Sequence, residues 1–368
     1  MKISPIAGTV LAFVTAVSLV GCAANEAPTS AAPGGESSAP GASALSGTLQ
    51  GTGASSMKAA QEKWVADFQT ANPAVTVNYS PDGSGAGRDA FAAGGADFAG
   101  SDRPLKDEEI GAGKFAGCAA DSSALNLPVY ISPIAIIFNV EGVTDLTLDP
   151  ATVAGIFAGT ITKWNDPAIA ATNDGVTLPD ATITAVHRAD GSGTTNNFTD
   201  TLSKLAPEVW TWGAADEWPA DLSGENATGT SGVVQTVTQG TNTIGYADAS
   251  AAAKLGHASL LVNGTPLQPT AEAAAAIVDH SPKIEGRPEH DLALSLDRTA
   301  EGAYPAVLVS YAIVCQTYAD SAKGALVKAY LGYVASAEGQ AAAAGAAGSA
   351  PLSSDLQAQV KAALDSVK

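Results

Sequence analysis

The stretch SGTLQGTGASSMKAAQEKWVADFQTANPAVTVNYSPDGSG, residues 46–85, alternates strand and helix signals. GTLQG predicts a short strand, and AVTVNYS predicts the next one. Between them, apolar residues recur at helical spacing and predict a helix over residues 57–69: Met57, Ala60, Trp64, Val65 and Phe68. A strand–helix–strand start is typical of a parallel sheet covered by helices.

The rest of the chain continues this α/β pattern in two blocks. A helix near residues 87–93 leads to a strand that ends at Ser101 and Asp102. The β-rich run LPVYISPIAIIFNV contains a proline and suits a connection that leaves one domain for another, and AYPAVLVSYAIVC is long enough to return. We therefore predict two α/β domains joined by hinge crossovers with a ligand cleft between them. Domain I would comprise residues 47–130 plus 303–368, and domain II residues 131–302.

Three loops of glycine and hydroxyl residues follow predicted strands. DGSG occurs at residues 82–85 and again at residues 190–193, and GTGASS occupies residues 51–56. Ligands of open α/β sheets bind at this end of the strands. Glycine lets the backbone approach a ligand closely, and a following helix N-terminus favours negative charge. One such loop usually only makes a turn, but three at equivalent strand ends predict a site for a small anion.

Arg188 and Asp102 refine the chemistry of that site. The Arg188 guanidinium suits a tetrahedral oxyanion, although a structural salt bridge to Asp190 or Asp102 is an alternative role. A carboxylate such as Asp102 repels an anion unless the anion carries a proton to donate. Protonated phosphate has such a proton and sulfate has none, so we expect Asp102 to select phosphate over sulfate.

Composition and motifs weigh against other classes of function. The 368-residue chain carries a net charge of −19, which argues against nucleic-acid binding. It contains no P-loop, HExxH or GxSxG motif, and a Rossmann assignment of GTGASS is weak. A secreted phosphatase or esterase using Ser84 or Ser192, or an adhesive surface protein, remains an alternative. His187 would point away from Arg188, and the Trp210, Trp212 and Trp218 cluster suits packing better than sugar stacking.

The N-terminus resembles a bacterial lipoprotein signal. A short positive region, an apolar run and the sequence LVGC predict a signal peptide at residues 1–21 and lipidation, including palmitate, at Cys22. An ordinary signal peptide with a chance cysteine is the alternative. Residues 22–46, rich in Ala, Pro, Gly and Ser, predict a flexible tether. An exported protein enters an oxidising compartment, where Cys118 and Cys315 would form either a disulfide or two buried thiols. A metal site is not expected.

With these residues assembled, the chain from about Gly47 onward resembles the phosphate-binding lipoproteins of the bacterial high-affinity phosphate ABC transporter. The resemblance lies in the order and spacing of GTGASS, VNYSPDGSGAG, DFAGSDRPL, AGTITKWNDPAI, HRADGSGTTNNFT and TIGYADASAAA. It implies a type II periplasmic-binding-protein fold, no catalysis and no cofactor. The phosphate contacts that it implies are Ser55, Ser84, Asp102, Arg188, Ser192, Gly193 and Thr194.

The resemblance also carries two finer expectations. The family usually places an aromatic residue after the first hydroxyl, and here that position is Ser56, whose backbone N–H would contact the ligand. Asp190 matches the acid that orients the arginine. We therefore expect a monomeric, lipid-anchored, extracytoplasmic receptor that passes phosphate to a permease driven by a cytoplasmic ATPase. A receptor for sulfate, molybdate or a phosphonate is the alternative among binding proteins.

Overall fold

The opening stretch of the chain folds as the sequence predicts, into strand, helix and strand. The computed structural model describes residues 45–368. Its strands are β1 (Gly47–Gly53), β2 (Val75–Ser80), β3 (Phe98–Ser101), β4 (Ala124–Asn139), β5 (Thr147–Leu148), β6 (Thr184–Arg188), β7 (Glu225–Ala227), β8 (Thr243–Asp248), β9 (Gly256–Val262), β10 (Thr265–Leu267) and β11 (Val307–Cys315). Its helices are α1 (Lys58–Ala71), α2 (Ser84–Ala92), α3 (Pro150–Phe157), α4 (Pro167–Ala170), α5 (Gly193–Leu205), α6 (Gly229–Gln239), η1 (Ala249–Ala252), α7 (Ala271–His280), α8 (Ser321–Val334), α9 (Ala337–Ala347) and α10 (Ser354–Ser366).

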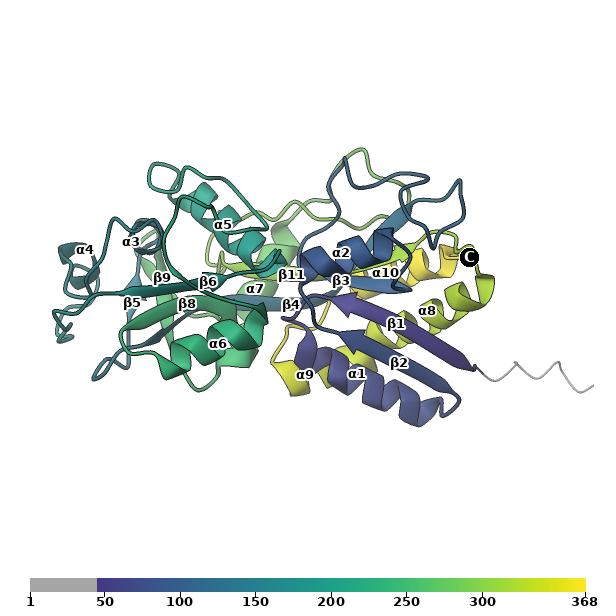
Figure 1. The fold of residues 1–368 in the computed structure, drawn as a ribbon, viewed down its shortest axis with the longest axis horizontal. Helices are drawn as coiled ribbons and strands as arrows, with labels where there is room; N and C mark the ends of the chain where they lie inside the picture. Colours follow the sequence, from purple (N-terminus) through teal and green to yellow (C-terminus); the bar gives the residue numbers. More distant parts are fainter. Residues whose placement is uncertain (1–44) are drawn as a thin grey trace, which may run out of the picture. The chain divides into compact units, whose positions relative to one another are not determined.

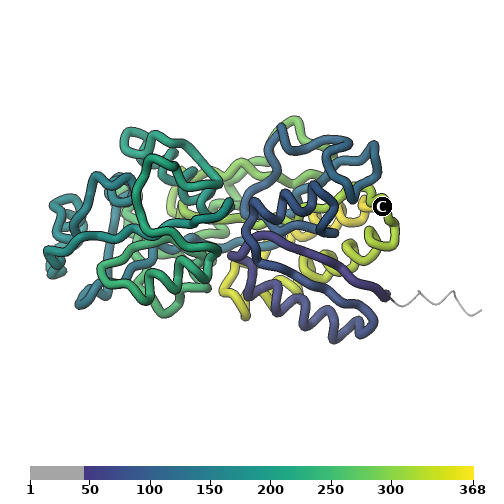
Figure 2. Tube along the Cα trace, in the orientation of Figure 1, coloured from purple at the N-terminus to yellow at the C-terminus, as the bar shows by residue number. Residues whose placement is uncertain are grey.

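The strands form a mixed sheet in the order β2-β1-β3-β11-β4-β8-β6-β7. β1 pairs in parallel with β2 and β3, which confirms the parallel pairing expected from the opening stretch. β6 pairs in parallel with β7 and β8. β11 lies antiparallel between β3 and β4 and therefore brings residues 307–315 beside residues 98–133. Figures 1 and 2 show helices on both sides of these strands.

The long strand β4 links two parts of the molecule. Its residues 124–133 pair with β11, and its residues 134–139 pair with β8. We call residues 45–133 and 307–368 the first half and residues 134–270 the second half. In Figure 1, β4 runs from the first half on the right into the second half on the left. The predicted domain boundaries lie close to this change of partner but remain a prediction.

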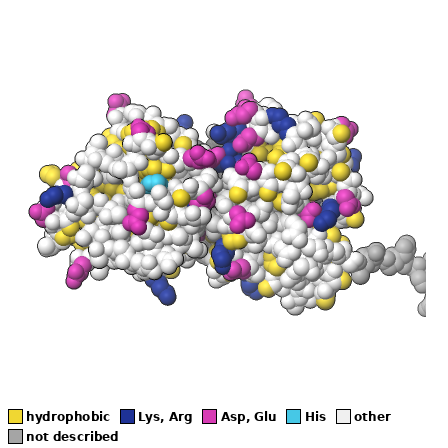
Figure 3. All heavy atoms as spheres, viewed as in Figure 1, with side chains coloured by type: hydrophobic (Ala, Val, Ile, Leu, Met, Phe, Trp, Pro, Cys, Tyr) yellow, Lys and Arg dark blue, Asp and Glu magenta, His cyan; other side chains and the backbone are white. Residues whose placement is uncertain are grey.

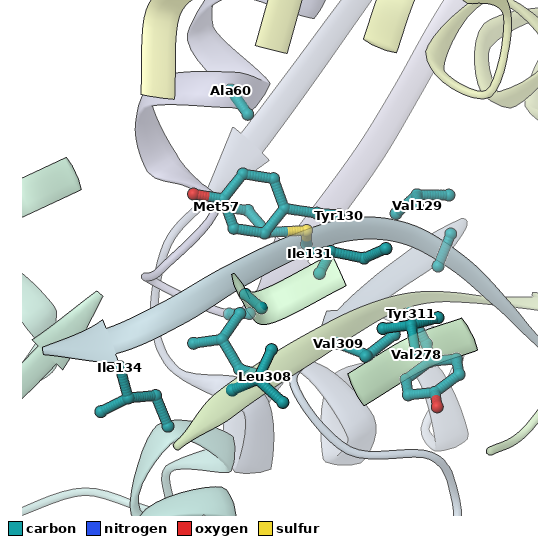
Figure 4. Packing of buried hydrophobic residues seen from close by; sticks show 14 of the residues in the cluster. Met57, Ala60, Val129, Tyr130, Ile131, Ile134, Val278, Leu308, Val309 and Tyr311 are labelled. Atoms are coloured by element: carbon teal, nitrogen blue, oxygen red, sulfur yellow. The ribbon is translucent and has the colours of Figure 1, made fainter. Parts of the chain in front are cut away.

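Aromatic and aliphatic side chains fix the helices of the first half on the sheet. Trp64 and Phe68 of α1 are buried one helical turn apart, as the sequence periodicity predicts. The Trp64 Nε1–H donates to the Gly339 carbonyl oxygen at 2.6 Å, and Phe68 meets Tyr330 edge-on at 5.3 Å. Figure 4 shows Met57 and Ala60 on the α1 side of β4 and Val278 of α7 beside β11. Apolar burial on both faces of the sheet therefore holds its central strands in place.

Helix α2 differs from the expected range in a way that matters for the site. We expected a helix near residues 87–93, but α2 begins at Ser84, inside the first DGSG loop. Gly83 precedes it with φ 102°, a conformation that glycine adopts at little cost. Ser84 thus lies in the first turn of a helix, where backbone N–H groups have no intrahelical partner.

Cys118 and Cys315 form a disulfide, with their Cα atoms 5.3 Å apart. The bond joins the segment after β3 to the last residue of β11, across a sequence separation of 197 residues. Of the two possibilities that the sequence left open, the structure therefore has the bonded pair. It ties two remote segments of the first half together.

The signal peptide at residues 1–21, lipidation of Cys22 and nearly all of the tether at residues 22–46 lie outside the described residues. Within residues 45–368, none of the helices has the length and apolar character needed to cross a membrane.

Candidate functional site

Asp102 occupies the centre of the site, directly after β3. It is 2% exposed, and its Oδ1 accepts hydrogen bonds from Ser56 Oγ at 2.6 Å and Ser310 Oγ at 2.8 Å. Its Oδ2 accepts one from Thr194 Oγ1 at 3.0 Å. Burial raises the pKa of Asp102, while these three hydroxyls and the positive charge of Arg188 oppose that rise. The carboxyl group therefore joins four segments of the chain at one buried point.

The two DGSG loops meet beside Asp102. Ser84 Oγ accepts a hydrogen bond from the Asp102 backbone N–H at 3.1 Å, and the Gly85 N–H donates to the Gly191 carbonyl oxygen at 2.9 Å. Gly193 packs so closely that a Cβ there would lie 2.6 Å from the Asp102 Cβ and 2.7 Å from Ser84 Oγ. The N-termini of α2 and α5 thus approach each other from opposite halves of the molecule.

Arg188, the last residue of β6, is 3% exposed and paired with Asp190. Its Nε donates to Asp190 Oδ1 at 2.7 Å, and its Nη2 contacts Asp190 Oδ2. Asp190 Oδ1 also accepts from the Gly229 N–H at 2.9 Å. Burial would raise the pKa of Asp190, but the hydrogen bonds and charge of Arg188 outweigh it and lower that pKa. Both roles that we considered for Arg188 remain compatible, since Asp190 fixes the orientation of the guanidinium.

Ser55 brings a third helix to the site. Its side-chain Oγ accepts from the Thr230 N–H at 3.0 Å and lies 3.0 Å from Thr230 Oγ1. Thr230 lies in the first turn of α6, in the second half, whereas Ser55 follows β1 in the first half. The hydroxyl therefore reaches across the junction to a helix N-terminus.

Ser192 has a structural role in addition to its predicted one. It is the N-cap of α5, where its Oγ accepts from the Thr195 N–H at 3.1 Å. The side chain is fully buried. As an acceptor in this bond, the hydroxyl keeps its own hydrogen for another partner.

The structure thus gathers all eight predicted ligand residues in and around one junction. The N-termini of α2, α5 and α6 converge there, where the first N–H groups of a helix have no partner within the helix and carry a partial positive charge. Arg188 adds a full positive charge, and Asp102 adds one carboxyl group. Such a set of donors suits a small anion, and a carboxyl among them suits one that carries a proton.

Two residues of the site were not predicted from the sequence. Ser310 donates to Asp102, and Thr230 donates to Ser55. Ser310 is a serine among mostly apolar residues in the strand VLVSYAIVC, and its buried side chain needs a partner. That buried serine was the available signal. Thr230 sits in ATGTSG, a glycine-rich helix start like the other loops, which could have been read in the same way.

The aromatic cluster packs rather than lining the site. Trp210 is 1% exposed, and its ring lies 5.1 Å from that of Trp212 and 5.5 Å from that of Trp218. His187 stacks on Trp218 at 4.6 Å, and its Nδ1 lies 3.0 Å from the Arg188 carbonyl oxygen. In the described part of the chain, neither Ser84 nor Ser192 hydrogen-bonds to a histidine, and no group of His, Cys, Asp and Glu side chains suits a metal ion.

Comparison with known proteins identifies the family of the chain. Residues 38–338 match the family described as a PBP superfamily domain. The phosphate-binding protein PstS 3 of Mycobacterium leprae is 37% identical over 343 residues, which cover 90% of each chain. PstS 2 of Mycobacterium tuberculosis is 35% identical over 352 residues, 91% of this chain and 93% of the relative.

Solved structures share the fold at lower identity. A high-affinity periplasmic phosphate-binding protein bound with phosphate matches with a TM-score of 0.69 and 23% identity, over 86% of this chain and 93% of its own. A phosphate-binding protein from Stenotrophomonas maltophilia matches with a TM-score of 0.65 and 20% identity, over 86% and 94%. The fold is thus that of the periplasmic binding proteins, as predicted. The chain belongs to the PBP superfamily and, within it, to the family of the phosphate-binding proteins called PstS.

Proposed function

We propose that this protein is an extracytoplasmic receptor that binds inorganic phosphate between its two halves and delivers it to an ABC importer. The observation that carries the proposal is the position of Asp102 among three helix N-termini and Arg188. Each carboxylate oxygen has about two acceptor positions. Within residues 45–368, Oδ1 uses both for Ser56 and Ser310, whereas Oδ2 has a single partner, Thr194. The remaining position on Oδ2 would accept the O–H of protonated phosphate.

The proposed ligand contacts are Ser55, Ser56, Ser84, Asp102, Arg188, Ser192, Gly193 and Thr194, with Asp190 in support. Among residues 45–368, Asp190 pairs with Nε and Nη2 of Arg188, and Nη1 makes no hydrogen bond. Nη1 would therefore donate to a phosphate oxygen. The predicted domains I and II would act as the two jaws, and β4 and β11 would be the crossovers about which they close.

Calorimetric titration of the purified protein with phosphate, sulfate and arsenate tests the proposal. We expect saturable binding of phosphate, competition by arsenate and much weaker binding of sulfate. Absence of saturable phosphate binding would refute it. Equal affinity for sulfate would favour a receptor for an unprotonated oxyanion instead.

Substitution of Asp102 by Asn tests its selectivity. We expect the wild-type protein to prefer phosphate over sulfate by about 10³-fold or more, because sulfate leaves the carboxylate without a donor. Asp102→Asn should narrow that preference by about 100-fold, since the amide can donate to a sulfate oxygen. The exposed Asp121→Asn provides the control. Unchanged selectivity in Asp102→Asn would remove the assigned role.

A phosphatase is the other class of function that remains to be tested. A serine nucleophile needs a base within hydrogen-bond reach. Ser84 Oγ instead accepts from the Asp102 N–H, and Ser192 Oγ accepts from the Thr195 N–H. We therefore propose that the protein does not hydrolyse esters, and a chromogenic phosphate ester should show no turnover.

The proposal extends to the anchor and the partners. Cys22 would carry the lipid, residues 22–46 would hold a monomeric receptor at the cell membrane, and a permease with a cytoplasmic ATPase would take up the phosphate. The LVGC sequence supports the anchor. Detergent partitioning of the wild-type protein against Cys22→Ala tests it, since loss of the lipid should move the protein into the aqueous phase.

A further inference from the structure

Asp216 joins the two halves through two arginines and is not one of the predicted ligand residues. Its Oδ2 lies 2.9 Å from Arg88 Nη2 and 2.7 Å from Arg103 Nη2, and its Oδ1 accepts from Arg103 Nε at 2.8 Å. The side chains of Arg88, Arg103 and Asp216 are 8%, 7% and 17% exposed. We call these three residues the Asp216 bridge.

The bridge crosses from one half of the molecule to the other. Arg88 lies on α2 and Arg103 follows Asp102, both in the first half, whereas Asp216 lies in the segment between α5 and β7 in the second half. Figure 3 shows Lys and Arg atoms beside Asp and Glu atoms where the two parts meet. The bridge can therefore form only when the halves are together.

The two arginines depend on an acid between them. Burial lowers the pKa of Arg88, and the positive charge of Arg103 lowers it further, whereas Asp216 and Glu109 raise it. Glu109 also pairs with Arg103, at 2.7 Å, but it belongs to the first half and stays with the arginines when the halves separate. Asp216 is thus the acid that links their charge to closure.

The bridge also contacts the segments that carry the ligand residues. The Asp216 carbonyl oxygen accepts from the Ser192 N–H at 2.8 Å, and Arg88 Nη1 donates to Ser101 Oγ at 2.9 Å, next to Asp102. The contact between Thr194 and Asp102 lies on the same junction. Forming the bridge and assembling the anion site therefore require the same approach of the two halves.

We propose that Asp216 is a positioning residue that latches the closed arrangement and slows release of the ligand. This inference takes phosphate as the ligand from the proposed function, whereas the contacts of the Asp216 bridge do not depend on that function. A buried ion pair that loses one partner leaves uncompensated charge, and this commonly shifts an equilibrium by about 100-fold. Without Asp216, the two arginines would repel each other in the closed arrangement and be solvated in the open one.

Asp216→Asn tests the latch, with Asp221→Asn as its matched control. Asp221 lies in the same segment, is exposed and accepts a hydrogen bond only from Trp212 Nε1 among the described residues. We expect Asp216→Asn to release phosphate at least about tenfold faster. The association rate and the melting temperature without phosphate should change little. Asp221→Asn should stay within about twofold of the wild-type protein in each rate.

A second measurement follows closure without phosphate. Fluorophores attached at the exposed positions Thr70 and Thr162 report the distance between the halves by energy transfer. Asp216→Asn should shift the population toward longer distances, and Asp221→Asn should not. An unchanged distance distribution, or unchanged phosphate release, would overturn the latch. If the wild-type protein failed to bind phosphate, the proposed function would fall while the distance measurement still decided on the latch.

A third experiment tests the repulsion between Arg88 and Arg103. Arg88→Gln added to Asp216→Asn removes one of the two positive charges that are then left with Glu109 as their shared acid. We expect the double variant to release phosphate more slowly than Asp216→Asn alone, which a double-mutant cycle measures as coupling. Independent, additive effects of the two substitutions would contradict the bridge as described.

Discussion

Gly193 illustrates how one residue decides whether the two halves can meet. Its φ lies outside the left-handed region, so alanine fits its backbone, but a Cβ would lie 2.6 Å from the Asp102 Cβ across the junction. We expect Gly193→Ala to weaken phosphate binding by about tenfold or more while stability stays close to that of the wild-type protein. Titration calorimetry and urea denaturation measure the two effects separately.

The matched control for this prediction is two residues away. A Cβ at Gly191 would meet only the Gly85 Cα within ordinary contact, at 3.5 Å. Gly191→Ala should therefore bind phosphate much more tightly than Gly193→Ala. Equal affinities for these two variants would show that the close approach at Gly193 does not matter.

At this scale the sequence predicted residue types better than contacts. The loops and the family resemblance brought forward Ser55, Ser84 and Ser192, and the structure gathers them at one junction. The bond from Ser310 to Asp102 spans 208 residues, and no local pattern encodes a partner so far away. The same holds for Asp216, which lies in an irregular segment whose position depends on packing.

At the scale of the element, Ser192 combines two functions that a paired substitution can separate. Ser192→Ala removes the N-cap of α5 and a predicted ligand donor, so we expect a loss of about 1 kcal/mol in stability together with weaker phosphate binding. Asp149→Ala removes the N-cap of α3, where Asp149 Oδ1 accepts from the Thr152 N–H at 2.8 Å. It should cost about the same stability and leave phosphate affinity unchanged.

Chemical denaturation and calorimetry of both variants check this prediction. Unchanged phosphate affinity in Ser192→Ala would mean that Ser192 caps α5 but does not bind phosphate. A loss of affinity in Asp149→Ala would mean that stability alone governs binding.

Elements with strong periodicity were predictable, and those set by a turn were not. The buried Trp64 and Phe68 mark α1 within two residues of its observed ends. The start of α2 was misplaced because glycine and serine have weak helix propensity, and the conformation of Gly83 determines where the helix begins. Tertiary contact with the second loop, through Gly85, accompanies that early start.

At the scale of the whole molecule, the disulfide should stabilise the fold without shaping the site. Replacing Cys118 and Cys315 by alanine frees a long loop in the unfolded chain, so we expect a loss of about 2–5 kcal/mol. Phosphate affinity should change by about twofold at most, because neither cysteine is among the predicted ligand residues. Urea denaturation measures the first effect and calorimetry the second. A much smaller loss of stability would show that packing of β11 already supplies the constraint.

The overall architecture followed from the alternation of strands and helices and from the resemblance of the loops. The position of β11 between β3 and β4 was harder to predict, because the sequence of an apolar strand does not indicate which strands it pairs with. The prediction that residues 303–315 return to the first domain was the one indication of where β11 lies.

The position of β11 in the sheet affects how the nascent chain folds. β3 and β4 leave a gap that only residues 307–315 fill, and this segment is synthesised long after both of its neighbours. An incomplete chain therefore exposes two strand edges, which favours slow folding and association with other chains. Truncation before Val307 should therefore yield aggregates, because the edges of β3 and β4 stay exposed until residues 307–315 are available to pair with them.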